Sequence, residues 1–145
     1  MTATQLLKET IAAFSMGDWS SMRDLLSDDV IAVAVASGGE TSAGADAFIE
    51  GDRNWRDAFS NFSVESHVVV GDEENAAGEF VLRGTHTGPL PTPWGMVAAT
   101  GREVELPFAV FCRVVDGRIV EVHDHYSPEL AMTQIGVEPS QVHAS

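Results

Sequence analysis

The spacing of the apolar residues changes partway along this chain, and that change limits the folds open to it. In the first part, apolar side chains recur every three or four residues, as at Leu7, Ile11 and Phe14, which is typical of helices with one buried stripe. From residue 63 onward, apolar and polar residues alternate, which is typical of strands. Helices that come first and strands that dominate later predict an α+β fold, with helices packed in the concave face of a curved, mostly antiparallel sheet.

Caps, glycines and prolines divide the chain into its predicted elements. Thr4 and Asp18 are suitable helix N-caps, and Gly17 and Gly136 are suitable helix ends. Residues 88–95 contain three prolines and are predicted to form a stiff loop without regular structure. The predicted elements are helices over residues 4–17, 18–26, about 45–59 and 127–136, and strands over 30–35, 63–70, 79–87, about 103–115 and about 118–126.

Composition restricts the classes of partner. The chain has 145 residues, with 22 acidic against 8 basic side chains and a formal net charge of −14. This charge repels phosphate backbones and anionic lipids, so neither nucleic acid nor a membrane is an expected partner. The length predicts one domain over residues 1–145, with an ordered core at about 5–136 and a loose tail at 138–145. The sequence shows no signal-peptide pattern or long apolar span, so a cytoplasmic location is expected.

A curved sheet that wraps around helices leaves a hollow on its concave side, and a ligand pocket is expected there. Phe48, Trp55 and Phe59 follow one side of the third predicted helix, at spacings of seven and four residues. Most stripes of this kind are core, but in this architecture some of them would face the hollow and make it apolar. Trp94, on the proline-rich loop, either covers the opening or packs against a partner chain.

The final hairpin decides which side chains face this hollow. A two-residue turn at 116–117 would place Arg113 on the same face as Val120 and Val122. A three-residue turn over 115–117 separates polar from apolar residues more cleanly, and we predict that turn. The inner face then carries Phe108, Val110, Cys112, Val120, Val122, Asp124 and Tyr126, and the outer face carries Ala109, Phe111, Arg113, Ile119, Glu121, His123 and His125.

On this register Asp124 extends an otherwise apolar face, roughly opposite Phe108. Removal from water disfavours a carboxylate, so the pKa of Asp124 is expected to rise from about 3.9, by up to a few units if burial is complete. Such a group suits general acid/base catalysis near neutral pH. The structural alternative is an Asp at a strand exit that meets solvent or caps the helix from Ser127. Tyr126 shares the face and either hydrogen-bonds a ligand or packs at the rim.

Short motifs follow one another along the chain in a characteristic order. They are Phe14–Asp18, Leu25–Val30, Arg83–Gly88, Ala99–Arg102, and Asp116–Glu121 followed by His123 and Asp124. With this order, over roughly residues 5–136, the chain resembles the SnoaL-like polyketide cyclase family, within the nuclear transport factor 2-like, ketosteroid-isomerase-like superfamily. The resemblance implies a cone-shaped α+β barrel that is commonly a homodimer through the outer sheet face. It also implies an acid/base Asp at the position of Asp124.

The chain departs from its catalytic relatives at several matching positions. The resemblance places Val110 where the cyclases carry a His, and it places Ala34 and Phe14 where ketosteroid isomerases carry an Asp and a Tyr. Limonene epoxide hydrolases carry Arg-x-Asp where this chain has residues 83–85, Arg-Gly-Thr. Chemistry by one Asp is therefore expected rather than by two acids.

These features predict a small, cofactor-independent enzyme that acts on a mostly apolar organic molecule with a carbonyl, enol or epoxide group. The reaction is a cyclisation, an isomerisation or an epoxide-hydrolase-like opening, in which Asp124 moves the proton and His86 or Arg83 polarises an oxygen. The alternative is a non-catalytic module that binds a hydrophobic ligand or another chain. The residues expected to contact the substrate are Phe14, Trp55, Phe59, Trp94, Phe108, Val110 and Tyr126.

Two single residues have structural interpretations beside the functional ones. His86 shares its parity with Phe80 and Leu82, so a buried histidine bonded to the backbone is the alternative to a role toward the substrate. Cys112 is the single cysteine, so it cannot form an internal disulfide, and its apolar surroundings favour an inert packed thiol.

A metal site is not predicted. Glu121, His123 and His125 lie on one predicted strand face and offer ligand atoms that metals use. Alternate residues of one strand are about 6–7 Å apart, however, which is too far for adjacent chelation without help from another element. A subunit interface or a solvated face is the expected role of these three side chains.

Overall fold

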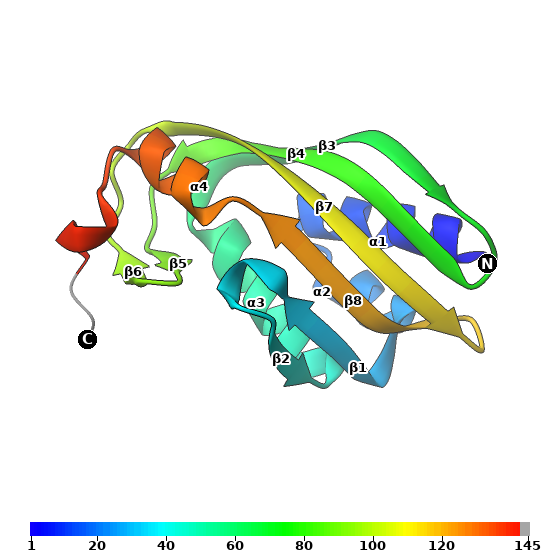
Figure 1. Cartoon of the computed structure of the whole chain (residues 1–145). Coiled ribbons are helices and arrows are strands. Elements are labelled where there is room, and N and C mark those ends of the chain that lie inside the picture. The colour runs from blue at the N-terminus through cyan, green and yellow to red at the C-terminus, as the bar shows by residue number, and fades with distance from the viewer. Residues whose placement is uncertain (143–145) are drawn as a thin grey trace.

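The protein is described by a computed structural model that covers residues 1–142. Its central feature in these residues is a curved six-stranded sheet (Figure 1). In spatial order the strands are β2 (Glu40–Ala43), β1 (Leu26–Ala34), β8 (Arg118–Tyr126), β7 (Glu103–Val115), β4 (Asn75–His86) and β3 (Phe59–Gly71). All neighbouring strands are antiparallel except β1 and β8, which are parallel.

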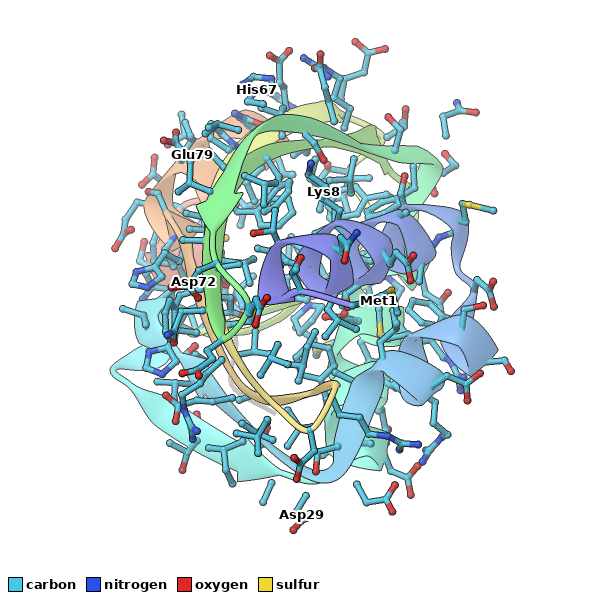
Figure 2. The ribbon with its side chains drawn as sticks, turned by 90° about the vertical axis from the view of Figure 1, so that its right-hand side faces the viewer. Met1, Lys8, Asp29, His67, Asp72 and Glu79 are labelled. Atoms are coloured by element: carbon cyan, nitrogen blue, oxygen red, sulfur yellow. The ribbon has the colours of Figure 1, made fainter. Side chains whose placement is uncertain are left out.

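Helices pack against the concave side of this sheet. Two of these helices are long, α1 (Ala3–Met16) and α3 (Ala45–Asp57), and they pack there together with the short α2 (Trp19–Leu25), while the short α4 (Pro128–Ile135) follows β8. Figure 2 views the molecule from one end and shows the sheet curling around α1, with His67 and Glu79 on the convex side. Within residues 1–142, no helix combines the length and apolar character needed to span a membrane.

The predicted α+β class is confirmed, but the sheet does not close. β2 and β3 are its two edges and do not pair with each other. Instead of the closed cone-shaped barrel that the resemblance implies, the protein has a deeply curved open sheet. Helices cover its concave side.

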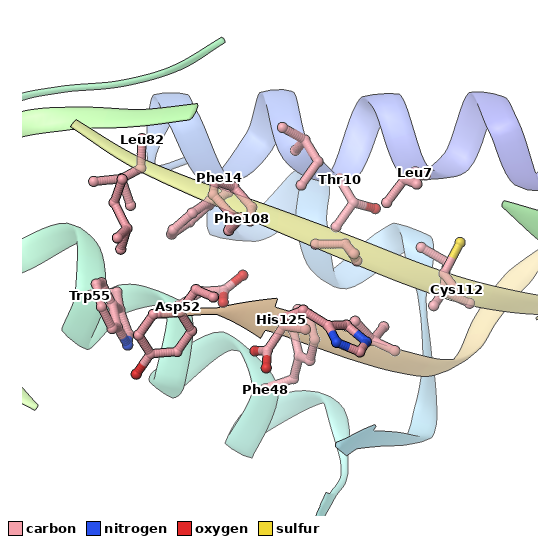
Figure 3. Close-up of a pocket in the computed structure, with 17 residues that line it drawn as sticks. Leu7, Thr10, Phe14, Phe48, Asp52, Trp55, Leu82, Phe108, Cys112 and His125 are labelled. Atoms are coloured by element: carbon pink, nitrogen blue, oxygen red, sulfur yellow. The ribbon is translucent and has the colours of Figure 1, made fainter. Parts of the chain in front are cut away.

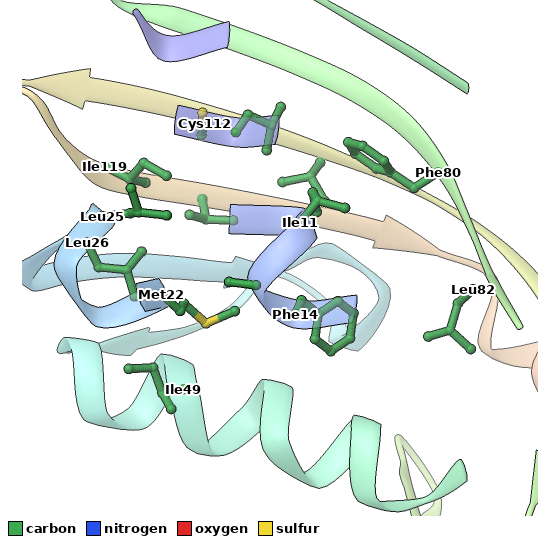
Figure 4. Close-up of a cluster of buried hydrophobic side chains, with 14 of the residues drawn as sticks. Ile11, Phe14, Met22, Leu25, Leu26, Ile49, Phe80, Leu82, Cys112 and Ile119 are labelled. Atoms are coloured by element: carbon green, nitrogen blue, oxygen red, sulfur yellow. The ribbon is translucent and has the colours of Figure 1, made fainter. Parts of the chain in front are cut away.

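The core lies between α1, α2 and the concave face of the sheet (Figure 4). Apolar residues at helical spacing on α1, including Leu7 and Ile11, meet apolar residues at strand spacing on β4, such as Phe80 and Leu82. The fully buried side chains in this layer include Leu6, Leu7, Met22, Leu26, Phe80 and Ile119.

Most helix ends follow the predicted signals. Gly17 ends α1 in the left-handed conformation, with φ of 71°, and the Asp18 side chain accepts a hydrogen bond from the Ser21 backbone N–H at the start of α2. The first cap differs, because α1 begins two residues earlier than predicted. Thr2, not Thr4, caps α1, since the Thr2 side chain and the Gln5 side chain satisfy each other's backbone N–H groups in a capping box.

Two segments that were predicted to be irregular contain regular structure. The proline-rich loop holds a small hairpin of β5 (Leu90–Thr92) and β6 (Gly95–Val97), in which the Thr92 hydroxyl donates to the Gly95 carbonyl at 2.6 Å. That side-chain bond closes the turn where Pro93 supplies no N–H group. In the predicted tail, Pro139–Gln141 form a single 3₁₀ turn, and the rest of that tail, residues 143–145, lies outside the described residues.

Candidate active site

A cavity opens between α1, α3 and the concave face of β7 and β8 (Figure 3). Its enclosed volume is about 100 Å³, and about 800 Å³ when all the space between the wall atoms and the solvent at the mouth are included. Two carboxyl groups, those of Asp52 and Asp124, line it, and among residues 1–142 no lysine or arginine does. Most of the wall is aromatic or aliphatic, including Phe14, Phe48, Trp55, Phe108, Val110 and Val122.

The hairpin that carries Asp124 has a two-residue turn, so the predicted three-residue turn is wrong. Val115 pairs with Arg118, which leaves Asp116 and Gly117 as the turn. Both turn residues have positive φ, 51° and 76°. This conformation matches the twist of tightly connected strands, and Asp-Gly is a favoured pair for it.

A β-bulge just beyond the turn turns the later residues of β8, including Asp124, to the inner face. The longer turn had been predicted to do the same. The register shifts between Ile119 and Glu121, and Val120 is the extra residue. Ile119 consequently points into the core with 0% exposure, whereas we expected Ile119 outside and Val120 inside. Beyond the bulge Asp124 shares the inner face with Val110, its direct partner on β7, instead of lying opposite Phe108.

Asp124 lies at the mouth of the cavity, near the end of β8. The residue is solvent-exposed, yet it lines the apolar wall. Loss of water at that wall raises the pKa of Asp124 above its usual value, while the positive charges of His125 and His123 act in the opposite direction. Asp124 is thus a carboxyl group at the border between solvent and an apolar chamber, and its role as catalytic base stays a prediction.

A second carboxyl group, which the sequence reasoning missed, enters the cavity from α3. The side chain of Asp52 points toward the space beneath α1 (Figure 3). Burial, together with the negative charge of Asp124, raises the pKa of Asp52 to about 8. No hydrogen bond or ion pair joins the Asp52 side chain to another residue in the described part of the chain. A proton therefore stays on Asp52 at neutral pH.

A signal for Asp52 was present in the sequence. Asp52 follows Phe48 by four residues and precedes Trp55 by three, which puts all three on one face of a helix. The aromatic residues alone predict which side of this helix faces the hollow, and Asp52 lies on that same side. An acidic residue at a core position of an amphipathic helix is a candidate functional group, because burial of a charge is costly.

Tyr126 lines the same cavity and forms part of its aromatic wall. Its ring meets the Trp55 ring edge to face, with 5.1 Å between the ring centroids. Burial, followed by the negative charges of Asp124 and Glu129, raises the pKa of Tyr126 to about 12. The phenol therefore stays protonated and can donate a hydrogen bond.

His86 occupies a different place from the one its candidate role requires. It is fully buried and does not line the cavity. The Thr100 backbone N–H donates to His86 Nδ1 at 3.3 Å, so the ring hydrogen lies on Nε2, which has no hydrogen-bond partner. Burial lowers the pKa of His86, and its ring packs near Phe59 at 5.9 Å between centroids. His86 is a neutral core histidine that secures the connection between β4 and β7.

Arg83 faces away from the cavity. Its neighbour Leu82 points inward from β4, and alternation along the strand turns Arg83 to the convex side. There its guanidinium group contacts Glu65 at 2.6 Å and Glu105 at 3.4 Å. The expectation that Arg83 polarises a substrate oxygen at this cavity is not supported by its position.

The structure gathers most of the predicted substrate-contact residues but not all of them. Phe14, Trp55, Phe108, Val110 and Tyr126 line the cavity. Phe59 lies behind the wall, stacked near Trp55, because the chain has left α3 and entered β3 at that point. Trp94 belongs to the turn of the β5–β6 hairpin and packs against the core. Neither of these two aromatic residues lines the cavity.

Two further predictions concern Cys112 and the outer face of β8. Cys112 is fully buried, and burial raises the pKa of its thiol to about 11, so the thiol stays protonated. On the outer face His123 Nε2 lies 2.9 Å from Glu121, which also contacts Arg113 at 3.6 Å. Across residues 1–142, no three His, Cys, Asp or Glu side chains are grouped so that they could hold a metal ion.

Comparisons with known proteins agree with this fold. The family model described as SnoaL-like polyketide cyclase matches residues 4–135. Among curated proteins, none matches this chain significantly.

Solved structures share this fold. A candidate polyketide cyclase from Xanthomonas campestris pv. campestris is 26% identical with a TM-score of 0.75, and the match covers 92% of this chain and 96% of that one. Another from Pseudomonas putida KT2440 is 28% identical with a TM-score of 0.71, covering 92% and 98% of the two chains. A protein of ketosteroid isomerase-like fold from Catenulispora acidiphila, solved with trimethylamine, is 19% identical with a TM-score of 0.75, covering 99% and 100%.

The family match spans nearly the whole chain and agrees with the α+β architecture and with the helix-lined concave sheet. This chain belongs to the SnoaL-like polyketide cyclase family.

Proposed function

We propose that this protein is a cofactor-independent enzyme that cyclises or isomerises a mostly apolar carbonyl compound, with Asp124 as the general base. The proposal narrows what family membership supports, which is cyclase or isomerase activity in general. The part of the substrate that enters the cavity is not an anion, because the wall offers two carboxyl groups and no lysine or arginine among the described residues.

The observation that carries the proposal is the position of Asp124. It lies where β8 meets the cavity mouth, so its carboxyl group reaches both the apolar chamber and solvent. A base in this position can meet an acidic C–H group on a bound molecule and can still exchange its proton with water. Its raised pKa strengthens it as a base.

The reaction needs proton transfer and no external oxidant or reductant. The Asp124 carboxylate takes a proton from the carbon next to the carbonyl, and the C–H electron pair moves toward oxygen to give an enolate. In a cyclisation the enolate carbon attacks a second carbonyl of the same molecule, and the new alkoxide takes the proton back. In an isomerisation the proton returns to a different carbon.

The first step can be measured on a simple probe. The bicyclic ketone 2-tetralone is apolar and has acidic protons next to its carbonyl, so their exchange in D₂O, followed by proton NMR, reports enolisation. We expect Asp124→Asn to slow the enzyme-catalysed exchange by about a hundredfold or more, as loss of a general base does. Asp116→Asn, an exposed change at the turn of the same hairpin, is the matched control and should exchange like the unaltered protein. Full activity in Asp124→Asn would contradict the assignment.

A non-catalytic binding module is the second candidate. It is favoured by the absence of His86 and Arg83 from the cavity, which leaves the predicted polarising groups elsewhere. It predicts that 2-tetralone raises the thermal unfolding temperature of the protein without any proton exchange. Measuring both proton exchange and the thermal unfolding temperature on one sample with 2-tetralone therefore distinguishes an enzyme from a binding module.

We also propose that the protein is a homodimer through its convex sheet face, as the family resemblance implies. The convex side presents a shallow apolar groove that includes Val68, Val70, Ala109 and Phe111. Val68 and Val70 are exposed in the single chain and would be covered by a second copy. Sedimentation analysis should give a dimer, and Val70→Asp should shift it toward monomer; a monomer across the micromolar range would contradict the proposal.

A further inference from the structure

We propose that Asp52 is a second catalytic carboxyl group of this site, which keeps its proton while Asp124 is ionised and donates a hydrogen bond to the substrate oxygen. The inference rests on the proposed function, since it adds the acid to a reaction in which Asp124 is the base. It gives the site the polarising group that the positions of His86 and Arg83 do not provide.

The geometry that supports the proposal begins on α3. Asp52 projects from the interior of this helix, with Phe48 one turn before it and Trp55 one turn after it, and all three line the cavity (Figure 3). Its carboxyl group has no partner among the side chains described. A polar group in an apolar wall is costly when it is unpaired, so the site is completed by a ligand oxygen that accepts its hydrogen bond.

The charges that face the cavity put the proton on Asp52 rather than on Asp124. Asp124 lines the same cavity as Asp52, and its negative charge opposes a second negative charge on Asp52. β8 also brings His125 to the cavity rim, and the positive charges of His125 and His123 favour the ionised form of Asp124. The negative charge of Asp124 and the loss of water around Asp52 together favour a proton on Asp52.

The other polar groups around the cavity are neutral. The Thr10 hydroxyl of α1 donates to the Leu6 carbonyl at 2.8 Å. Burial keeps the Cys112 thiol of β7 protonated by raising its pKa to about 11, and it does the same for the Tyr126 phenol, whose pKa rises to about 12. None of these groups compensates a negative charge on Asp52.

The nearest cations are engaged elsewhere. Arg53 and Arg56 share α3 with Asp52, but Arg53 lies over the Trp19 ring at 5.6 Å and Arg56 lies over the Phe62 ring at 5.5 Å. Arg23 of α2 forms an ion pair with Asp46, at the start of α3. These contacts leave the Asp52 carboxyl without a cation that would favour its ionised form.

The chemical step uses both carboxyl groups at once. As Asp124 removes the proton from carbon, negative charge builds on the carbonyl oxygen, and the Asp52 O–H group donates a hydrogen bond to that oxygen. If the proton transfers fully, the enolate becomes an enol and Asp52 becomes a carboxylate, and the proton returns when the new bond forms. A donor aimed at a developing oxyanion contributes about 10²–10³-fold to the rate in other enzymes.

The position of the proton can be tested without a substrate. Carbon-13 NMR of the aspartate carboxyl groups in the whole protein gives each pKa, with Asp52 and Asp124 assigned from the Asp52→Asn and Asp124→Asn variants. We expect Asp52 to titrate near pH 8, at a higher pH than Asp124. In Asp124→Asn the pKa of Asp52 should fall, because the neighbouring negative charge is gone. Titration of Asp52 near pH 4 in the unaltered protein would overturn the proposal.

The donor role is tested by two variants of the same position in the 2-tetralone exchange. Asp52→Leu keeps the size without a donor and should slow exchange by about a hundredfold, whereas Asp52→Asn keeps an N–H donor and should stay within about tenfold. Exchange by the unaltered protein should decline above pH 8, and that decline should vanish in Asp52→Asn. Asp57→Asn, an exposed change at the end of α3, is the control for folding and should exchange normally.

The outcomes separate this proposal from the proposed function. Equal rates for Asp52→Leu and Asp52→Asn would remove the donor role while leaving Asp124 as the base. No exchange by the unaltered protein, together with titration of Asp52 near pH 8, would remove the proposed function and leave the proton where we place it.

Discussion

The two ends of the space beneath the curved sheet are built from similar elements and filled in opposite ways. Beneath α2, the inner side chains are Met22, Leu25 and Leu26, and all three are buried in a continuous apolar cluster. Between α3 and β8, aromatic side chains surround a cavity into which Asp52 and Asp124 project. One end is packed and the other is hollow and acidic.

The two helices present different side chains to the space beneath the sheet. α2 is short and presents only apolar residues to the sheet, so its side chains close the space. α3 presents the aromatic rings of Phe48 and Trp55 and, between them, the carboxyl group of Asp52. The desolvation of that group weakens stability locally, and functional sites commonly accept such a cost.

The largest expected effect comes from truncating a leucine at each end. Leu26→Ala removes a side chain with 0% exposure from the packed end and should lower the free energy of unfolding by about 2–5 kcal/mol. Leu82→Ala removes a leucine that already borders the cavity, so it gives up fewer contacts and should cost at least about 1 kcal/mol less. Urea unfolding of both variants checks this, and equal losses would mean that the two ends are packed alike.

The next largest effect is the decrease in the free energy of unfolding that the buried Asp52 carboxyl group causes at neutral pH. Its pKa is raised on folding, so the folded state binds the proton more tightly than the unfolded state, and stability falls as pH rises from about 4 to about 8. Asp52→Asn removes this loss and should stabilise the protein at pH 7 by about 2–3 kcal/mol, after allowance for water at the mouth. At pH 4 the gain should vanish.

Urea midpoints measured at pH 4, 5.5, 7 and 8.5 test the Asp52 effect. Asp57→Asn, on the same helix but exposed, should show no such dependence. A gain for Asp52→Asn that is the same at every pH would contradict the raised pKa.

A smaller gain is expected from α3 itself. Gly51 lies in the interior of the helix, and nothing lies within 4 Å of the position that a new Cβ would take. Gly51→Ala should raise the free energy of unfolding by about 0.5–1 kcal/mol through helix propensity alone. Gly17→Ala is the contrasting control and should destabilise, because Gly17 has φ of 71° and its Cβ would meet Arg56 at 3.0 Å. The thermal unfolding temperature reports both.

The smallest effect belongs to the convex side. Arg83→Gln breaks the exposed contacts with Glu65 and Glu105, which are screened by water and salt, so stability should change little and less still at high salt. The rate of 2-tetralone exchange should not change. A large drop in that rate would mean that Arg83 reaches the reaction after all.

Sequence patterns located the elements well where a local rule governs them. The caps at Asp18 and Ser127, the ends at Gly17 and Gly136, and the strands on each side of Asp116-Gly117 all follow from neighbouring residues. The position of Asp124 on the inner face of β8 was also predicted, but from a three-residue turn that the hairpin does not have. A bulge at Val120 produced the same parity, and single-residue bulges leave no pattern in a chain of alternating residues.

The site depended on contacts between residues far apart in the chain. The helical spacing of α3 and the alternation of β8 predict which face of each element is buried. Whether Asp52 and Asp124 line one cavity depends on how the two elements pack. The same holds for His86, which has the inward parity of Leu82 but lies beyond the end of the cavity. Alternation tells which face a side chain takes and not how far along that face the hollow extends.

The chain's own residues thus determined the class of fold, the order of its elements, the family and an acidic residue on the inner face of the last strand. Tertiary structure alone decided that the sheet stays open, that Asp52 and Asp124 share one cavity, and that Arg83 stays outside it. The reason is physical. Propensity and periodicity act over a few neighbouring residues, whereas the pKa of a carboxyl group is set by the water and charges that distant segments remove or bring.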